Sequence, residues 1–294
     1  MRVIVMLAIS LLIVLSSCNS AEEKTSDENV STKQNQDKVG QEPKQSNEEK
    51  TDVSPDVEEK NGEDQKELAE RQKSLYRVSE NWSLVPIEEG TNEKVVLLTI
   101  DDAPEKYSLE MAKTLKELDA GAIFFVNGHF IDTPEEQEML KEIHEMGFVI
   151  GNHTYSHVNL GAIENNPDKQ REEIIKLNDL IEDIIGERPK FFRAPHGVNT
   201  ELSKQIAIEE QMVLMNWSYG YDYFTPYMDK EKLTEAMVSG KGPEVDVPYS
   251  LLKPGANLLM HDREWTNAAL KDIVLGLREQ GYEVLDPHEI KTIE

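Results

Sequence analysis

Short apolar runs alternate with longer segments of helical periodicity between residues 94 and 285, and this alternation constrains the fold more than any other feature. The runs with the length and composition of strands are 94–100, 122–126, 148–150, 190–193, 212–217, 257–260 and 282–285. The segments with helical periodicity are 109–118, 135–146, 171–185, 230–238 and 266–280. Regular alternation of strands and helices predicts an α/β fold with parallel strands.

Glycines mark four of the expected helix-to-strand junctions, at Gly121, Gly147, Gly186 and Gly281. Glycine is the usual residue just past the end of a helix, so these positions support the assignment. About seven strands in this order fit either an irregular (β/α) barrel or an open doubly wound sheet. In both architectures the functional groups gather at the carboxyl ends of the strands.

The amino terminus has the pattern of a secretory signal, in which an apolar run over residues 3–15 follows Arg2. A membrane-spanning helix needs about 20 residues, so this run is too short to be one. It ends at Leu15, Ser16 and Ser17 before the single cysteine, Cys18, and this resembles the lipobox of bacterial lipoproteins. The resemblance implies a signal peptide over residues 1–17 and a lipidated Cys18. A free thiol or an intermolecular disulfide is the alternative.

Residues 19–75 are rich in Glu, Lys, Gln, Ser, Asn and Asp and contain no aromatic residue. Such a segment has too little apolar surface to repay the entropy lost on folding. We therefore expect a disordered linker over residues 18–80 and one folded domain over residues 81–294. This domain carries 20 of the 26 excess negative charges, and a surface of that sign repels nucleic acid.

Polar side chains follow four of the expected strands, where each strand ends. Asp101 and Asp102 follow the run at 94–100, and His153 follows the run at 148–150. Arg193 ends the run at 190–193, and His261 follows the run at 257–260. Because carboxyl ends of parallel strands meet at one edge of a sheet, we expect these groups to form one site.

The spacing of His153 and His157 places two imidazoles on one side of a helical turn, where they can share a metal ion. Taken alone, such a pair is more often two polar side chains on the protein surface. Metalloproteases with this spacing have Glu directly after the first His as general base, whereas this chain has Thr154. Asp101 and Asp102 can supply the missing carboxylates, although two acids before Pro104 also fit a turn or a helix cap.

Four short motifs resemble those of the polysaccharide deacetylase family, which has the NodB-type domain and is carbohydrate esterase family 4. They occur in the family's order, as Thr-Ile-Asp-Asp-Ala-Pro at 99–104, His153 to His157, Arg-Ala-Pro-His-Gly at 193–197 and Leu-Met-His at 259–261. The likeness covers about residues 94–290. It implies an irregular (β/α) barrel of about seven parallel strands and hydrolysis of an N-acetyl group.

The resemblance also implies a role for each motif residue. Asp101 is the general base, and His261 is the general acid. Asp102, His153 and His157 hold one divalent ion, with Zn²⁺ expected and Co²⁺, Ni²⁺ or Mn²⁺ as alternatives. Arg193 orients Asp101, the backbone N–H of His196 faces the oxyanion, and Leu259 and Trp217 line the acetyl pocket.

Three motifs depart from the family's usual pattern. In the first, Ile100 and Ala103 stand where the family has Phe and Gly, and both changes are mild. His196 stands where the family has an aromatic residue after proline. In the segment after Trp217, Gly220 and Tyr223 stand where the family has Asp and Trp, so Asp222 is the candidate partner that keeps His261 protonated.

We therefore expect a lipid-anchored hydrolase of linear amides on the outer face of the bacterial cell membrane. Its substrate would be an N-acetylated polysaccharide, such as peptidoglycan GlcNAc or MurNAc or a chitin-like glycan. We expect a monomer that contacts the membrane only through its anchor and binds no nucleic acid. Two alternatives stay open: an O-acetyl esterase or non-sugar amidase on the same scaffold, and a catalytically silent glycan-binding lipoprotein.

Overall fold

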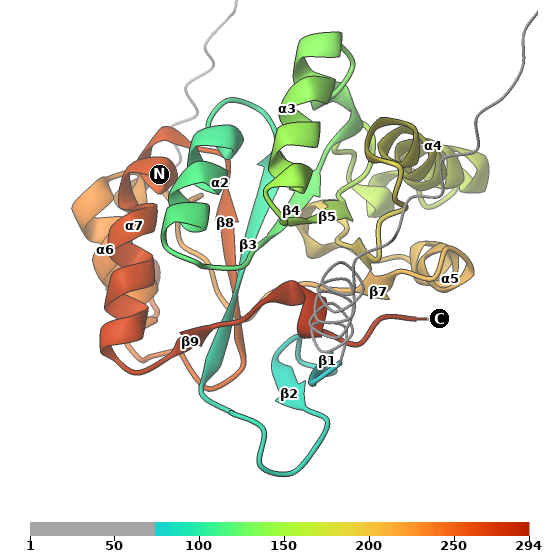
Figure 1. Ribbon diagram of the computed structural model, residues 1–294. Coiled ribbons are helices and arrows are strands. Elements are labelled where there is room, and N and C mark those ends of the chain that lie inside the picture. Colours follow the sequence, from blue (N-terminus) through green and yellow to red (C-terminus); the bar gives the residue numbers. More distant parts are fainter. Residues whose placement is uncertain (1–73, 294) are drawn as a thin grey trace, which may run out of the picture. The chain divides into compact units, whose positions relative to one another are not determined.

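The computed structural model describes residues 74–293, shown in Figure 1. The expected signal peptide over residues 1–17, Cys18 and most of the expected linker over residues 18–80 lie outside the described residues. Between residues 74 and 293, no helix combines the length and the apolar character that crossing a membrane requires.

A seven-stranded sheet forms the centre of the fold, and every strand pair in it is parallel. The order is β7-β6-β5-β4-β3-β8, and β9 pairs with the start of β3. The strands are β3 (Val95–Ala103), β4 (Ile123–Val126), β5 (Val149–Asn152), β6 (Phe191–Phe192), β7 (Val213–Leu214), β8 (Ala256–His261) and β9 (Glu283–Val284). All seven strands expected from the sequence are confirmed.

The chain that follows β7 joins the two edges of this sheet. At one edge, the backbone N–H of Met215 donates to the carbonyl of Phe192 beside β6. A few residues on, Ser218 N–H donates to the carbonyl of Asn257, and Tyr219 bridges to Leu258 of β8. The sheet therefore curls into an irregular (β/α) barrel, as expected.

Six α-helices of the described part lie around the strands (Figure 1). They are α2 (Ser108–Glu117), α3 (Pro134–Glu145), α4 (Pro167–Ile185), α5 (Glu201–Glu209), α6 (Lys230–Ser239) and α7 (Glu264–Glu279). Five were expected, whereas α5 was not. Its nine residues include Ile208, which is 66% exposed, so the apolar residues of α5 do not form one clean stripe.

Strand β3 divides two apolar cores because its side chains alternate between the faces of the sheet. Val95 and Leu97 point into the barrel, and Leu97 joins Phe125 there in one cluster. Val96 and Leu98 belong to the core under the surrounding helices. All nine residues of β3 are buried, which explains its continuous apolar run.

A short hairpin at the start of the described chain packs on the inner core. Strands β1 (Tyr76–Val78) and β2 (Leu84–Pro86) pair antiparallel, and Tyr76 is 3% exposed within that core. The folded part thus begins upstream of residue 81, inside the segment that the sequence analysis assigns to the linker. Strand β1 has only three residues, which is too short for its sequence to show the periodicity of a strand.

Gly186 ends α4 in the left-handed conformation, at φ 75°, as expected of a C-cap. At Gly121, close packing rather than a left-handed backbone requires glycine. A Cβ atom there would lie 2.6 Å from the carbonyl oxygen of Leu285, so close packing against the segment after β9 requires the missing side chain.

Candidate active site

Two adjacent carboxylates, Asp101 and Asp102, occupy the carboxyl end of β3. Asp101 is 2% exposed and Asp102 is 8% exposed. Asp102 has a left-handed backbone, with φ of 60°, which is costly for a residue other than glycine. Helix α2 begins only at Ser108, with Tyr107 as its N-cap, so the pair is not the helix cap that Pro104 had suggested.

His153 and His157 lie on a loop after β5. The prediction that they share a helical turn is therefore wrong. Thr154 and His157 both have left-handed backbones, with φ of 67° and 54°. This irregular path, rather than the rise of a helix, brings the two imidazoles to a ring-centroid separation of 5.0 Å. Strained backbone is typical of functional sites, where surrounding contacts hold it.

Three buried side chains hold the loop that carries these histidines. The Asn127 amide donates to the carbonyls of His153 and Thr154, at 2.7 and 3.1 Å. The Asn152 side chain accepts from the backbone N–H of Thr154 at 2.8 Å. Glu173 on α4 accepts from the backbone N–H and the hydroxyl of Ser156, at 2.8 and 2.7 Å. These bonds fix the loop without regular secondary structure.

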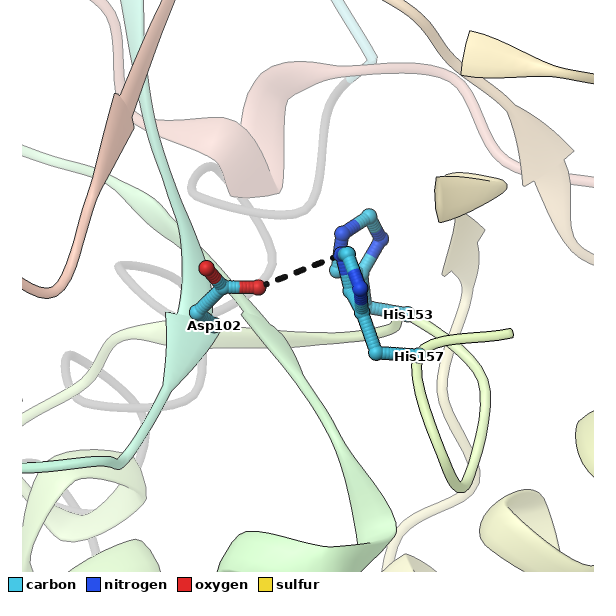
Figure 2. A group of neighbouring side chains, drawn as sticks. All are labelled: Asp102, His153 and His157. Carbon is cyan, nitrogen blue, oxygen red and sulfur yellow. Dashed lines mark ion pairs between the residues drawn. The ribbon is translucent and has the colours of Figure 1, made fainter. Parts of the chain in front are cut away.

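Asp102, His153 and His157 form a group whose ligand atoms all lie within 4.8 Å of one another (Figure 2). The Nε2 atom of His157 is 3.4 Å from Oδ1 of Asp102. Two ligands at about 2.1 Å from a tetrahedral Zn²⁺ ion are separated by about 3.4 Å, so this spacing fits one ion. In the described residues, this is the only group of three or more such side chains.

The histidines present the correct ring atoms to an ion. Nδ1 of His153 lies 2.7 Å from the carbonyl oxygen of Arg193. Since a carbonyl can only accept, Nδ1 carries the proton and Nε2 keeps a free lone pair. Burial lowers the pKa of His153, and burial together with the adjacent His153 imidazole lowers the pKa of His157 to about 4. Both rings are therefore neutral at pH 7, the form that binds metals.

The charge of Asp102 is stabilised by its surroundings. Burial raises the pKa of this carboxyl, but the nearby positive groups outweigh burial and lower it. His261 has the largest effect, followed by His153 and His157 in their protonated forms and by Arg263. Asp102 is thus ionised at neutral pH, as a metal ligand must be.

Arg193 follows β6 and fills the barrel beneath the site, where its side chain is fully buried. Its guanidinium donates to Oδ1 of Asp101 at 2.6 Å and to the Thr99 hydroxyl at 2.8 Å. Backbone carbonyls of Met215 and Asn216 accept further bonds from Arg193. This set satisfies a buried charge pair and fixes the orientation of Asp101.

His261 ends β8 and pairs with Asp222, as the sequence suggested. Nδ1 of His261 is 2.8 Å from Oδ1 of Asp222, and the His261 backbone N–H donates to Oδ2 at 2.6 Å. Thr266 on α7 donates to the same Oδ2 at 2.8 Å. Burial alone would lower the pKa of His261, but the charge of fully buried Asp222 outweighs burial and raises it to about 9. His261 is protonated at neutral pH.

The three expected pocket residues surround this arrangement. His196 has a left-handed backbone, with φ of 59°, and its ring centroid lies 5.0 Å from that of His157. Leu259 is 2% exposed and lies opposite Thr99 in the β3–β8 ladder. Trp217 is half-buried and packs beside Gly197.

Sequence reasoning missed Arg263 beside Asp102 and the three side chains that hold the histidine loop, Asn127, Asn152 and Glu173. Arg263 donates to Oδ2 of Asp102 at 2.6 Å, and Glu173 holds the histidine loop. Arg263 follows His261 by two residues, so its position after a strand end was a usable signal. Glu173 lies within an ordinary amphipathic helix, and nothing in the sequence distinguishes it there.

Comparisons with known proteins agree with the motifs. The family model described as polysaccharide deacetylase matches residues 88–214. Two proteins of Bacillus cereus named peptidoglycan-N-acetylglucosamine deacetylase are similar. One is 35% identical over 128 residues, which are 43% of this chain and only 45% of that protein. The other is 30% identical over 205 residues, which are 68% of this chain and 71% of that protein.

Among solved structures, a CE4-family pseudoenzyme from Bacillus anthracis is 28% identical, with a TM-score of 0.57. The match covers 68% of this chain and 67% of that one. A mutant of the pseudoenzyme, described as having restored enzymatic activity, matches with 29% identity and the same TM-score.

Proposed function

This chain belongs to the polysaccharide deacetylase family, and on that basis we propose that it uses one divalent ion to remove N-acetyl groups from a cell-wall polysaccharide. The deacetylases of Bacillus cereus named above support peptidoglycan N-acetylglucosamine as the substrate. N-acetylmuramic acid in the same polymer and a chitin-like glycan are the neighbouring choices.

One observation carries this proposal: the proposed base and the proposed acid face each other in the sheet. Asp101 of β3 and His261 of β8 are register partners in the parallel ladder, and Asp102 of the metal group directly follows Asp101. A carboxylate paired with a buried arginine and an imidazole held protonated are thus fixed beside the group proposed to bind the metal. Pairs of titratable groups whose environments favour opposite protonation states are typical of acid–base catalysis.

Asp102, His153 and His157 would hold the ion, and Zn²⁺ suits a set of two imidazoles and one carboxylate. When bound, such an ion polarises the carbonyl of the acetamide and lowers the pKa of a water molecule beside it. Co²⁺, Ni²⁺ and Mn²⁺ accept the same ligands and are alternatives.

Asp101 would take the proton from the attacking water. Its Oδ1 accepts from Arg193, which fixes the orientation of the carboxylate and leaves Oδ2 to face the site. The Arg193 side chain has no exposed surface, so the base cannot turn away without breaking a buried charge pair. General-base catalysis of this kind contributes about 10²- to 10⁴-fold to rate.

His261 would give its proton to the amine nitrogen as the C–N bond breaks. Its raised pKa of about 9 keeps that proton available at neutral pH. The backbone N–H of His196 would donate to the oxyanion, and Leu259 and Trp217 would line the space for the acetyl methyl group.

Two other activities have specific support. The likeness to a pseudoenzyme favours a silent glycan-binding protein. Against it, this chain keeps the metal group, the Asp101–Arg193 pair and the His261–Asp222 pair in contact. His196, which replaces the family's usual aromatic residue, favours a changed acyl or sugar pocket, as in an O-acetyl esterase or a non-sugar amidase.

We propose that the protein acts outside the cytoplasm, held to the outer face of the cell membrane by a lipid on Cys18. The signal-like residues 3–15 and the lipobox-like residues 15–18 support this. The anchor would be its one contact with the membrane, and the acidic surface disfavours nucleic acid. We expect a monomer.

The proposal is tested by incubating the purified protein with a panel of acetylated polymers and measuring released acetate. The panel contains peptidoglycan fragments, chitooligosaccharides and acetylated xylan. We expect release from glycans with N-acetyl groups, and mass spectrometry of the products identifies GlcNAc or MurNAc as the site. Release from acetylated xylan alone would favour the esterase, and binding without release would favour the silent protein.

A further inference from the structure

Arg263 contacts a proposed metal ligand although no motif includes it. It lies directly after Asp262, and its guanidinium donates to Oδ2 of Asp102 at 2.6 Å. The other oxygen of the carboxylate, Oδ1, faces Nε2 of His157 at 3.4 Å. The two oxygens of Asp102 are thus divided between the arginine and the metal group.

Contacts outside the metal group hold Arg263 in this position. A second nitrogen of its guanidinium donates to Glu105 at 2.7 Å and to the backbone carbonyl of Asp262 at 2.8 Å. Arg263 is also the N-cap residue of α7, so its backbone is fixed at the start of a long helix. The side chain has two anchors that do not depend on Asp102.

The neighbouring residue strengthens this arrangement. Asp262 is 2% exposed, and its carboxylate accepts from the backbone N–H groups of Lys106, Tyr107 and Ser108. The hydroxyl of Ser108 donates to it as well. These four bonds join the end of β8 to the loop between β3 and α2, which also carries Glu105. The base of the Arg263 side chain and one of its anchors therefore belong to one rigid unit.

Each carboxylate of the adjacent pair thus has its own arginine. Arg193 binds Asp101 from inside the barrel, with no exposed surface. Arg263 binds Asp102 from the rim, where its side chain is 33% exposed. Carboxylates that bind metals are commonly held by a second group, and the loss of such a group costs about 10- to 100-fold in metal affinity.

We propose that Arg263 is a positioning residue for the metal centre, which holds Asp102 so that Oδ1 alone faces the ion. Asp102 would then bind the ion through one oxygen only, and such a ligand set leaves room for water and the acetyl carbonyl. This inference rests on the proposed metal-dependent function. In the opposing model, the positive charge of Arg263 merely occupies the place of the metal ion. Removing Arg263 would then raise the affinity for the metal.

The test is a Co²⁺ titration of the full chain, followed by the visible absorption of the bound ion, which reports its coordination geometry. We compare wild type with Arg263→Met, Arg263→Lys, Glu105→Gln and Asp102→Ala. We expect Arg263→Met to weaken Co²⁺ binding about 10- to 100-fold and to alter the absorption spectrum. Arg263→Lys should recover part of the affinity, because lysine keeps the charge but cannot form the same fork of contacts.

Arg171→Met is the matched control, since Arg171 is 38% exposed and forms a 2.8 Å ion pair with Glu209 away from the site. It should bind Co²⁺ as wild type does. Equal or tighter binding by Arg263→Met, with the wild-type spectrum, would overturn the inference. If that variant does not unfold cooperatively, Glu105→Gln provides the test, because it removes the charge that anchors Arg263. Weaker Co²⁺ binding by Glu105→Gln would support the positioning role of Arg263, and unchanged Co²⁺ binding would contradict it. If wild type binds Co²⁺ no better than Asp102→Ala, the proposed metal function itself is wrong, and the inference falls with it.

Discussion

The two sides of the site are built in different ways. On the metal and base side, Asp101, Asp102 and His153 stand at the carboxyl ends of β3 and β5, the two strands that flank β4, and each is at most 8% exposed. On the acid side, His261 also ends a strand, but its partner Asp222 lies in an irregular segment between β7 and α6. The first side follows from the sheet itself, whereas the second depends on how a loop packs.

Tyrosines and helix contacts position the loop that carries Asp222. The hydroxyls of Tyr219 and Tyr221 donate to the carbonyls of Met237 and Gly240 at the end of α6. The indole of Trp265 on α7 donates to the backbone carbonyl of Asp222 at 2.8 Å. The position of Asp222 is therefore set by the packing of α6 and α7. We therefore expect substitutions on the two sides of the site to reduce activity in different ways.

The base side should show the largest loss of activity. Asp101→Asn removes the proton acceptor but keeps an oxygen that can accept from Arg193. We expect kcat to fall on the order of 10³-fold on N-acetyl glycans and on 4-nitrophenyl acetate alike. Released acetate and nitrophenolate measure the two reactions. A variant within tenfold of wild type on both substrates would contradict a base role for Asp101.

The acid side should show a loss that depends on the leaving group. His261→Gln cannot protonate the departing amine, so deacetylation of a glycan should slow about 10²- to 10³-fold. Hydrolysis of 4-nitrophenyl acetate, whose leaving group needs no proton, should slow less than tenfold. Steady-state kinetics on both substrates measure this difference. Equal losses would mean that His261 supports the site without acting as an acid.

The third prediction concerns pH. The raised pKa keeps His261 in its active, protonated form, so wild-type activity should decline as pH rises through about 9. Asp222→Asn removes the charge that raises this pKa, so the decline should move from about 9 toward the ordinary value of 6.5 or below. Profiles of kcat against pH measure the shift. Tyr223→Phe is the control, because its ring lies 5.7 Å from that of His261 and carries no charge. Profiles that coincide would refute the pairing.

The smallest effect should come from the support under the histidine loop. Glu173→Gln replaces a buried carboxylate that accepts two bonds from Ser156, so the free energy of unfolding should fall by about 1.5–3 kcal/mol. Glu172→Gln is a matched control, since that exposed side chain only pairs with Lys169 and should change stability by less than about 1 kcal/mol. Denaturant unfolding measures both variants. Equal stability of the two would show that Glu173 does not hold the loop.

Sequence reasoning reached the metal and base side because short motifs and strand ends coincide there. The carboxyl ends of parallel strands meet at one edge of a sheet, so the sheet alone brings Asp102 and His153 together. It was wrong about the helical turn between His153 and His157, because side-chain spacing cannot reveal the left-handed backbones at Thr154 and His157. Contacts between distant elements, such as Arg263 with Asp102, depend on tertiary packing and leave only a weak trace in the sequence.

The same limit explains the missed elements of the fold. Strand β1 has three residues and becomes recognisable only through its pairing with β2. Helix α5 has an exposed Ile208 that blurs its pattern. Long, regularly patterned helices such as α4 were found because amphipathic periodicity is a local property.

We propose that one ion, held by Asp102, His153 and His157, serves a base and an acid on adjacent strands. The most direct measurement is acetate release from a chitooligosaccharide by the full chain after chelation and during stepwise return of Zn²⁺. We predict no release by the chelated protein and full recovery near one ion per chain, with no recovery for Asp102→Ala. Release at the wild-type rate in the presence of chelator would contradict the account.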